Sequence, residues 1–103
     1  MKLDDFQDIV MGFVYVESEL PNFIYPAIGL AGETGEVMEE IKKSIREGLT
    51  IPKNRRENIK KELGDVLFYV AMLAESLDLS LEEIANENIR KLTERHGPPK
   101  PKR

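Results

Sequence analysis

The apolar residues of this chain recur at the three- and four-residue spacing of amphipathic helices in four successive stretches. The first stretch covers residues 3–17, and Leu20-Pro21-Asn22 ends it. The second runs from Pro26, a residue that the first turn of a helix accepts, to Gly48. The N-terminal half of the chain is therefore predicted to form two helices.

The third stretch is the most apolar part of the chain. It follows a loop over residues 48–54 and the basic pair Arg55-Arg56, and it runs to about Leu77. Its middle, residues 66–74, is apolar on nearly every side. A helix of this kind is buried on more than one side, so we expect it to pack against its own chain or against a partner subunit.

The fourth stretch carries the clearest start signal. Ser80 and Glu83 have the three-residue spacing of a capping box, so a helix is expected to begin at this point. Four apolar positions of this helix are expected to face a core: Ile84, Ala85, Ile89 and Leu92. The fold class predicted for the chain is all-α and four-helix bundle-like, with one domain over residues 1–96 and a basic, proline-broken tail over residues 97–103.

Composition narrows the classes of partner and compartment. The chain has 103 residues, a net charge of -4 and no cysteine, which excludes disulfides and thiolate metal sites and argues against a nucleic acid polymer as the main ligand. Its first five residues carry two acids and no leading apolar run, and the run over residues 66–74 is too short to span a bilayer. The sequence therefore predicts a cytoplasmic protein that does not enter membranes.

Two pairs of acidic residues stand out against this background. Glu33 and Glu36 are three residues apart in the second predicted helix, and Glu62 and Asp65 repeat this spacing in the third. Residues at this spacing share one face of a helix, so two neighbouring helices would bring four carboxylates together. A metal site and an ordinary solvated acidic surface both explain the pattern.

A metal held by these acids would be a hard cation. Carboxylate oxygens select Mg²⁺, or Mn²⁺, and leave coordination positions for water and phosphates. The chain has a single histidine, His96, and no EF-hand, P-loop or Gly-x-Ser-x-Gly motif, which argues against zinc, calcium and serine chemistry. The sequence thus favours Mg²⁺.

Three glycines accompany the first acid pair inside the second predicted helix, at Gly29, Gly32 and Gly35. A glycine in an exposed helix interior costs roughly 1 kcal/mol relative to alanine. Either small residues let another backbone or a ligand approach the acids, or the helix begins late with a loose first turn. The sequence leaves both explanations open.

Together these residues resemble a known family. Gly-Leu-Ala-Gly-Glu-Thr-Gly-Glu-Val at residues 29–37, followed by Glu-Leu-Gly-Asp-Val-Leu at residues 62–67, is similar to the motifs of the all-α nucleoside triphosphate pyrophosphohydrolases of the MazG type. The family signature is Glu-x-x-Glu, a spacer, and Glu-x-x-Asp. The resemblance extends to Asn88, Lys91 and Arg95 and covers about residues 25–96.

The resemblance implies an enzyme that cleaves a nucleoside triphosphate between its α and β phosphates, giving a nucleoside monophosphate and pyrophosphate. It implies that Glu33, Glu36, Glu62 and Asp65 hold Mg²⁺, and one glutamate, Glu36 or Glu33, would also serve as the general base. The downstream residues listed next would bind the substrate phosphates: Asn88, Lys91 and Arg95. The resemblance also implies a homodimer or homotetramer that packs its central helices into bundles.

Other functions remain open from the sequence. Phosphoribosyl-ATP pyrophosphohydrolases and dimeric dUTPases use similar paired acids, and a non-catalytic helical interaction module is an alternative from another class. Aromatic residues of the first helix, such as Phe6 and Phe13, would suit a nucleobase, but this spacing is also that of core residues. The sequence does not identify the base or sugar of a substrate.

Overall fold

The computed structural model of the chain describes residues 1–102 except residues 16, 18 and 49. The described residues form four helices and no strand: α1 (Leu3–Met11), α2 (Ile24–Arg46), α3 (Lys53–Ser76) and α4 (Leu81–His96). The predicted all-α fold is thus confirmed.

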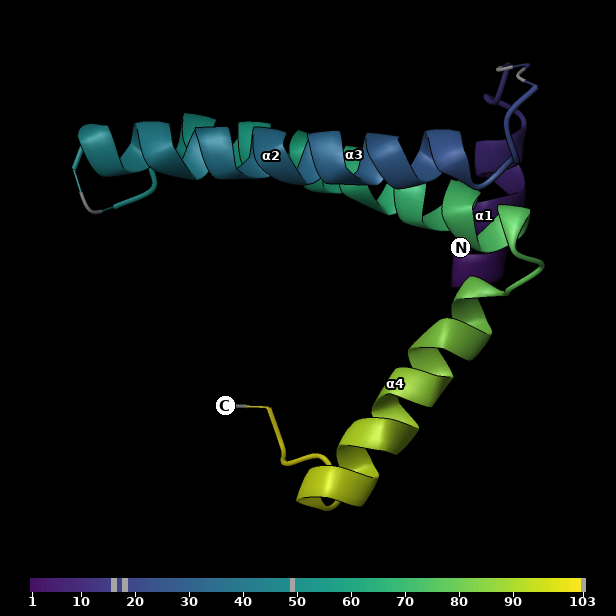
Figure 1. Cartoon of the computed structure of the whole chain (residues 1–103). Helices are drawn as coiled ribbons and strands as arrows, with labels where there is room; N and C mark the ends of the chain where they lie inside the picture. Colours follow the sequence, from purple (N-terminus) through teal and green to yellow (C-terminus); the bar gives the residue numbers. More distant parts are fainter. Residues whose placement is uncertain (16, 18, 49, 103) are drawn as a thin grey trace.

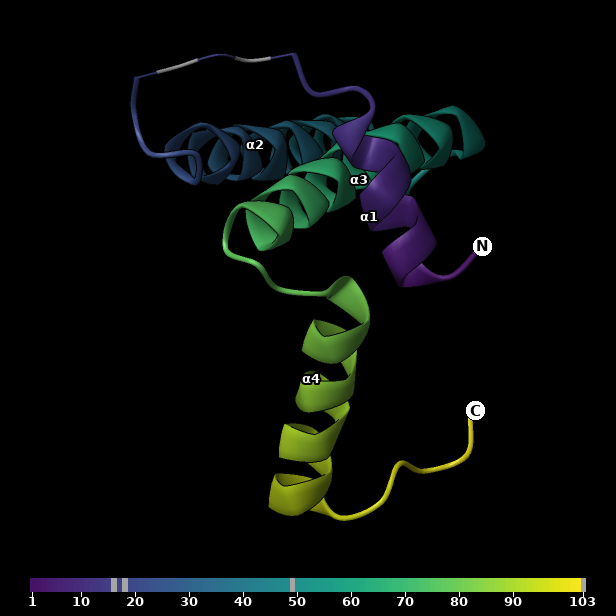
Figure 2. The same cartoon turned by 90° about the vertical axis from the view of Figure 1, so that its right-hand side faces the viewer.

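A long hairpin of α2 and α3 is the centre of the fold. The two helices have 23 and 24 residues and run antiparallel, side by side, as Figures 1 and 2 show. Near the connection between them, Arg55 donates a hydrogen bond from its guanidinium to the Glu40 carboxylate at 3.2 Å and also pairs with Glu47. Arg55 lies in the first turn of α3, and the helix begins at Lys53, slightly earlier than the sequence predicts.

The core lies at the opposite end of the hairpin, where α1 crosses α3 (Figure 2). Five apolar residues are buried there: Val10, Ala71, Met72, Ala74 and Leu81. Five partly buried side chains pack around them: Phe6, Val14, Phe68, Tyr69 and Val70. The C-terminal half of α3 therefore supplies most of the core, as its apolar sequence predicts.

The first helix is shorter than predicted. It ends at Met11, where the Gly12 backbone N–H donates to the Ile9 carbonyl at 3.0 Å and the Phe13 N–H donates to the Val10 carbonyl at 2.9 Å. Glycine is a poor helix former, and Phe13 beyond it is 64% exposed, so burial of Phe13 does not favour another turn. The predicted helix over residues 3–17 is wrong in its second half, of which residue 16 lies outside the described residues.

The fourth helix starts where the sequence places it and then leaves the other three. Ser80 is its N-cap, and the Ser80 side-chain oxygen accepts a hydrogen bond from the Glu83 backbone N–H at 3.3 Å. In Figures 1 and 2, α4 extends away from the α2–α3 hairpin. Its apolar residues Ile84, Ile89 and Leu92 are 38%, 55% and 41% exposed, so the prediction that they face a core is wrong for the single chain.

A polar junction joins the first turn of α4 to α1. Gln7 is buried, and its side-chain amide donates to the Glu75 carboxylate and to the Leu79 carbonyl, each at 2.8 Å, while its oxygen accepts from the Leu81 backbone N–H at 2.8 Å. Asp4 accepts hydrogen bonds from the Ser80 hydroxyl at 2.7 Å and from the Glu82 N–H at 3.0 Å. This junction sets the direction in which α4 leaves.

Over the described part of the chain, no helix combines the length and the apolar character needed to cross a membrane.

Candidate functional site

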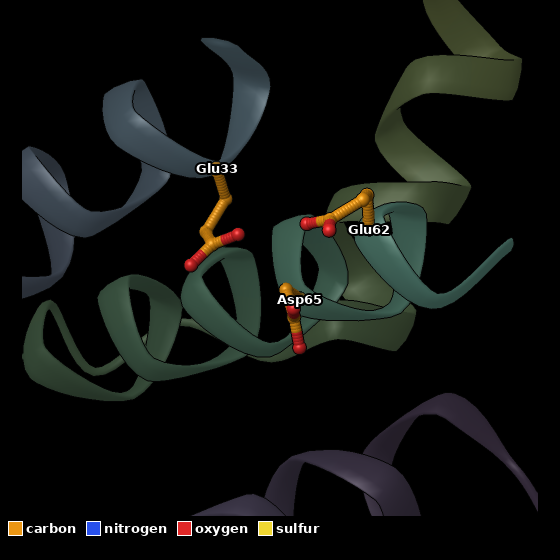
Figure 3. Close-up of side chains that lie close together, drawn as sticks. All are labelled: Glu33, Glu62 and Asp65. Carbon is orange, nitrogen blue, oxygen red and sulfur yellow. The ribbon is translucent and has the colours of Figure 1, made fainter. Parts of the chain in front are cut away.

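Three carboxylates meet between the two helices of the hairpin. Glu33 projects from α2, and Glu62 and Asp65 project from α3, so that one oxygen of each lies within 4.8 Å of the others (Figure 3). Glu33 and Glu62 are half-buried and Asp65 is exposed. Among the described residues, this is the group of acidic side chains that is close enough to share one metal ion.

The negative charges of this cluster act on one another. The pKa of the Glu33 carboxyl is raised above its ordinary value, first by burial and then by the charges of Asp65, Glu62 and Glu36 and by a hydrogen bond with Glu62. Each of these effects disfavours the ionised form of Glu33. A cation between the carboxylates would relieve the repulsion, which is the behaviour expected of a metal site.

The structure brings together three of the four predicted acids and leaves Glu36 at the edge. Glu36 lies one turn beyond Glu33 on α2 and is exposed, and it is not one of the three clustered side chains. Its charge nevertheless contributes to the raised pKa of Glu33. Helical spacing places Glu33 and Glu36 on one face, but only Glu33 lies directly opposite the acids of α3.

A glycine determines how closely the two helices approach beside the cluster. A Cβ atom on Gly29 would lie 2.3 Å from the nearest ring atom of Tyr69, whereas one on Gly32 or Gly35 would meet nothing within 4 Å. Since α2 begins at Ile24, the explanation that the helix starts late is wrong. Close approach of another element explains Gly29, and the open surface beside Gly32 and Gly35 leaves room for a ligand.

Tyr69 is a member of this region that the sequence reasoning missed. It lies one turn beyond Asp65 on α3, and its ring centroid is 6.2 Å from that of Tyr25 on α2. A hydrogen bond with Tyr25, burial, and the nearby charges of Glu33 and Asp65 raise the pKa of the Tyr69 hydroxyl. The four-residue spacing from Asp65 was the signal in the sequence, since it puts both on one face of a helix.

The predicted phosphate-binding residues lie elsewhere. Asn88 and Lys91 line a shallow groove on α4, and Arg95 lies a turn further along the same helix. Figure 1 shows this helix directed away from the part of the hairpin that carries the acids. A single chain therefore does not bring the predicted basic residues to the carboxylate cluster.

Comparison with known proteins identifies the family. The 40% identical Gene 37 protein of Mycobacterium phage L5 aligns over 72 residues, which are 69% of this chain and 63% of that protein. The uncharacterized protein YpjD of Bacillus subtilis (strain 168) is 35% identical over 66 residues, which are 64% of this chain and 60% of that protein. The chain thus covers less than two thirds of the length of these curated relatives.

No solved structure matches the chain with statistical significance. The MazG nucleotide pyrophosphohydrolase domain, however, matches residues 27–98, which include the whole acidic cluster and α4. A match over this share of the sequence shows that the chain belongs to the MazG nucleotide pyrophosphohydrolase family.

Proposed function

We propose that this protein is a metal-dependent nucleoside triphosphate pyrophosphohydrolase. It cleaves a ribo- or deoxyribonucleoside triphosphate between the α and β phosphates and releases a nucleoside monophosphate and pyrophosphate. The observation that carries this proposal is the meeting of Glu33, Glu62 and Asp65 in a chain of a nucleotide pyrophosphohydrolase family. Removal of unwanted nucleotides from the cellular pool is a role that suits such an activity.

The donor set fits Mg²⁺, and Mn²⁺ is an acceptable substitute. All three clustered side chains offer carboxylate oxygens, which hard divalent cations prefer, and the exposed side of the cluster leaves positions for water and phosphate oxygens. We assign Glu33, Glu62 and Asp65 as ligands. Glu36 joins them in the proposal as a fourth ligand, reached by rotation of its exposed side chain.

The chemistry divides between the ion and the protein. When bound, Mg²⁺ supplies positive charge to the triphosphate oxygens and acidifies a water molecule. Glu36 has an alternative role in the proposal, that of general base when its exposed side chain is not turned to the ion, and Glu33 is the other candidate. Glu33 and Glu62 are themselves half-buried, which limits the freedom of their side chains.

The phosphate-binding role of Asn88, Lys91 and Arg95 requires a second copy of the chain. Because α4 is directed away from its own acids, we propose that α4 of one subunit lies over the cluster of its partner in a homodimer, or in a homotetramer built from such dimers. Exposed apolar residues support this assembly, both on α4 and on the hairpin: Ile84, Ile89, Leu92, Met38, Leu63 and Leu67. Their burial would supply the association energy.

The test is pyrophosphate release from canonical and modified nucleoside triphosphates, with Mg²⁺ and with EDTA. Release that requires the metal would support the proposal and rank the substrates. If folded protein releases pyrophosphate only from phosphoribosyl-ATP or from dUTP, the related pyrophosphohydrolases become the correct class. If it releases none from any substrate while still binding Mg²⁺, the protein is a non-catalytic module.

A further inference from the structure

An apolar pocket of about 430 Å³ lies at the core end of the hairpin. It is lined by α1, the α1–α2 connection, the first turns of α2 and the last turns of α3, and eight of its twelve lining residues are apolar. Met11 and Met72 face it from two different helices, and Tyr25 and Ile28 face it from α2. Most of this pocket precedes residue 27, where the family match begins.

Along both α2 and α3, the pocket lies toward the core end of the hairpin from the carboxylate cluster. Ile28 is five residues before Glu33 on α2, and Met72 is seven residues after Asp65 on α3, which runs in the opposite direction. At 1.5 Å per residue, these separations are about 8 and 11 Å along the helix axes. In a nucleotide, the distance between the base and the phosphates is similar to these separations.

A pair of tyrosines connects the pocket with the acids. Tyr25 lines the pocket, its ring contacts that of Tyr69, and the charges of Glu33 and Asp65 act on the Tyr69 hydroxyl. A ligand that reaches from the carboxylates to the pocket therefore passes along two aromatic side chains. Aromatic faces of this kind suit the sugar and base of a nucleotide.

We propose that this pocket receives the nucleobase of the triphosphate whose phosphates lie at the carboxylate cluster. The inference rests on the proposed function and adds the site that recognises the base. The volume is in the range of small-molecule sites, and a flat, largely apolar base fits a pocket whose polar members stand among aliphatic and thioether side chains.

The chemistry of the pocket also determines how selective it is. Two of its four polar residues are already engaged, because the Ser76 hydroxyl donates to the Leu73 carbonyl at 2.7 Å and Glu75 accepts from Gln7 at 2.8 Å. Apolar pockets discriminate between similar ligands only by roughly 10- to 200-fold, and methionines adapt to different shapes. The enzyme is therefore expected to accept several bases while rejecting a triphosphate that has none.

The first test compares a nucleoside triphosphate with methyl triphosphate, which keeps the scissile bond and lacks the base. The wild type should cleave the nucleoside triphosphate with a kcat/KM about 10- to 100-fold higher, in proportion to the apolar contact that the base makes. Ile28→Ser should reduce this ratio several-fold by lowering kcat/KM for the nucleoside triphosphate alone. Ile45→Ser is the matched control, since Ile45 is also exposed on α2, 61% against 68%, and lies outside the pocket.

A second test reads binding without catalysis. The chain has no tryptophan, so Ile28→Trp places a single fluorescent reporter at the pocket, and Ile45→Trp is its control. Adenosine and cytidine monophosphates should each change the fluorescence of the first variant and leave that of the second unchanged. This result would support the base site even if the protein hydrolysed no substrate, which separates this inference from the proposed function.

Two outcomes would overturn the inference. One is an unchanged ratio of the two substrates in Ile28→Ser, and the other is an equal fluorescence response of both tryptophan variants.

Discussion

The α2–α3 hairpin and α4 carry the two halves of the predicted site, and the chain holds them in different ways. The acids stand between two long helices that pack along their length, with Gly29 and Tyr69 setting the distance between them. The basic residues of α4 stand on a helix that is fixed at its first turn by Asp4 and Gln7. The hairpin positions the acids within one chain, whereas α4 carries its basic residues away from them.

The largest expected effect concerns the hairpin. Asp65→Asn keeps the shape of the side chain and removes its charge, so pyrophosphate release should fall by at least about 100-fold while the helical circular dichroism stays unchanged. Glu57→Gln is the matched control, since Glu57 is an exposed acid of α3 that is not in the cluster. Activity retained in Asp65→Asn would contradict the metal assignment.

A stability experiment tests the close packing of the hairpin. Gly29→Ala would place a Cβ atom 2.3 Å from the Tyr69 ring, so the ring or the helices must move, and we expect a loss of about 2 kcal/mol in the free energy of unfolding. Gly32→Ala is open to solvent and should instead stabilise the protein by up to about 1 kcal/mol. Denaturant unfolding measures the change in the free energy of unfolding for each variant. Equal changes in the two variants would show that Gly29 does not determine the spacing of the helices.

The next effect concerns α4. Lys91→Ala should raise KM about tenfold with little change in kcat, because one charge-assisted contact to a phosphate is lost. Its neighbour Arg90 is already paired with Glu87 and Glu94, so Arg90→Ala is the control and should leave KM unchanged. Steady-state kinetics on both variants decides whether Lys91 belongs to the site or is an ordinary solvated side chain.

Mixing two variants sharpens the comparison between the regions. If α4 serves the partner, a heterodimer of Asp65→Asn and Lys91→Ala subunits contains one site with both defects and one intact site. Mixed protein should then show more activity, at substrate concentrations below KM, than the average of the two variants. No gain over that average, in subunits shown to exchange, would contradict the proposal that α4 serves the partner subunit.

The smallest effect is at the start of α4. Ser80→Ala removes the N-cap hydrogen bond to Glu83 and the bond to Asp4, and it should cost about 1 kcal/mol of stability. The same measurement on Ser76→Ala, whose hydroxyl donates to the Leu73 carbonyl within α3, gives the reference value. A loss no larger than this reference would mean that the cap contributes little to holding α4.

The sequence allowed the hairpin to be predicted better than the rest. The paired spacing of Glu33 and Glu36 with Glu62 and Asp65 follows from helix geometry, and three of these four residues do meet. The end of α1 was not predictable in this way, because Phe13 and Val14 have the right spacing for a helix and the chain turns at Gly12 instead. The periodic pattern indicates which side of a helix is apolar, but it does not indicate whether another element covers that side. For this reason the apolar side of α4 was expected to face a core.

Features that depend on the approach of two helices could not be predicted from the sequence either. The contact of Gly29 with Tyr69 joins residues forty positions apart, and no local pattern indicates it. The pocket beside Tyr25 is lined by three helices and by the connection between α1 and α2, part of which the sequence predicts as helix. Local periodicity therefore located the acids, and tertiary packing decided what surrounds them.

The attachment of α4 at one end turns the helix into a lever arm. Arg95 is fourteen residues from Leu81, a length of about 21 Å along the axis. A tilt of about 10° at the Gln7 junction would move Arg95 by nearly 4 Å, which is more than the length of a hydrogen bond. The three 2.8 Å contacts of Gln7 thus set, from the far end of the helix, the precision with which its basic residues can meet a phosphate.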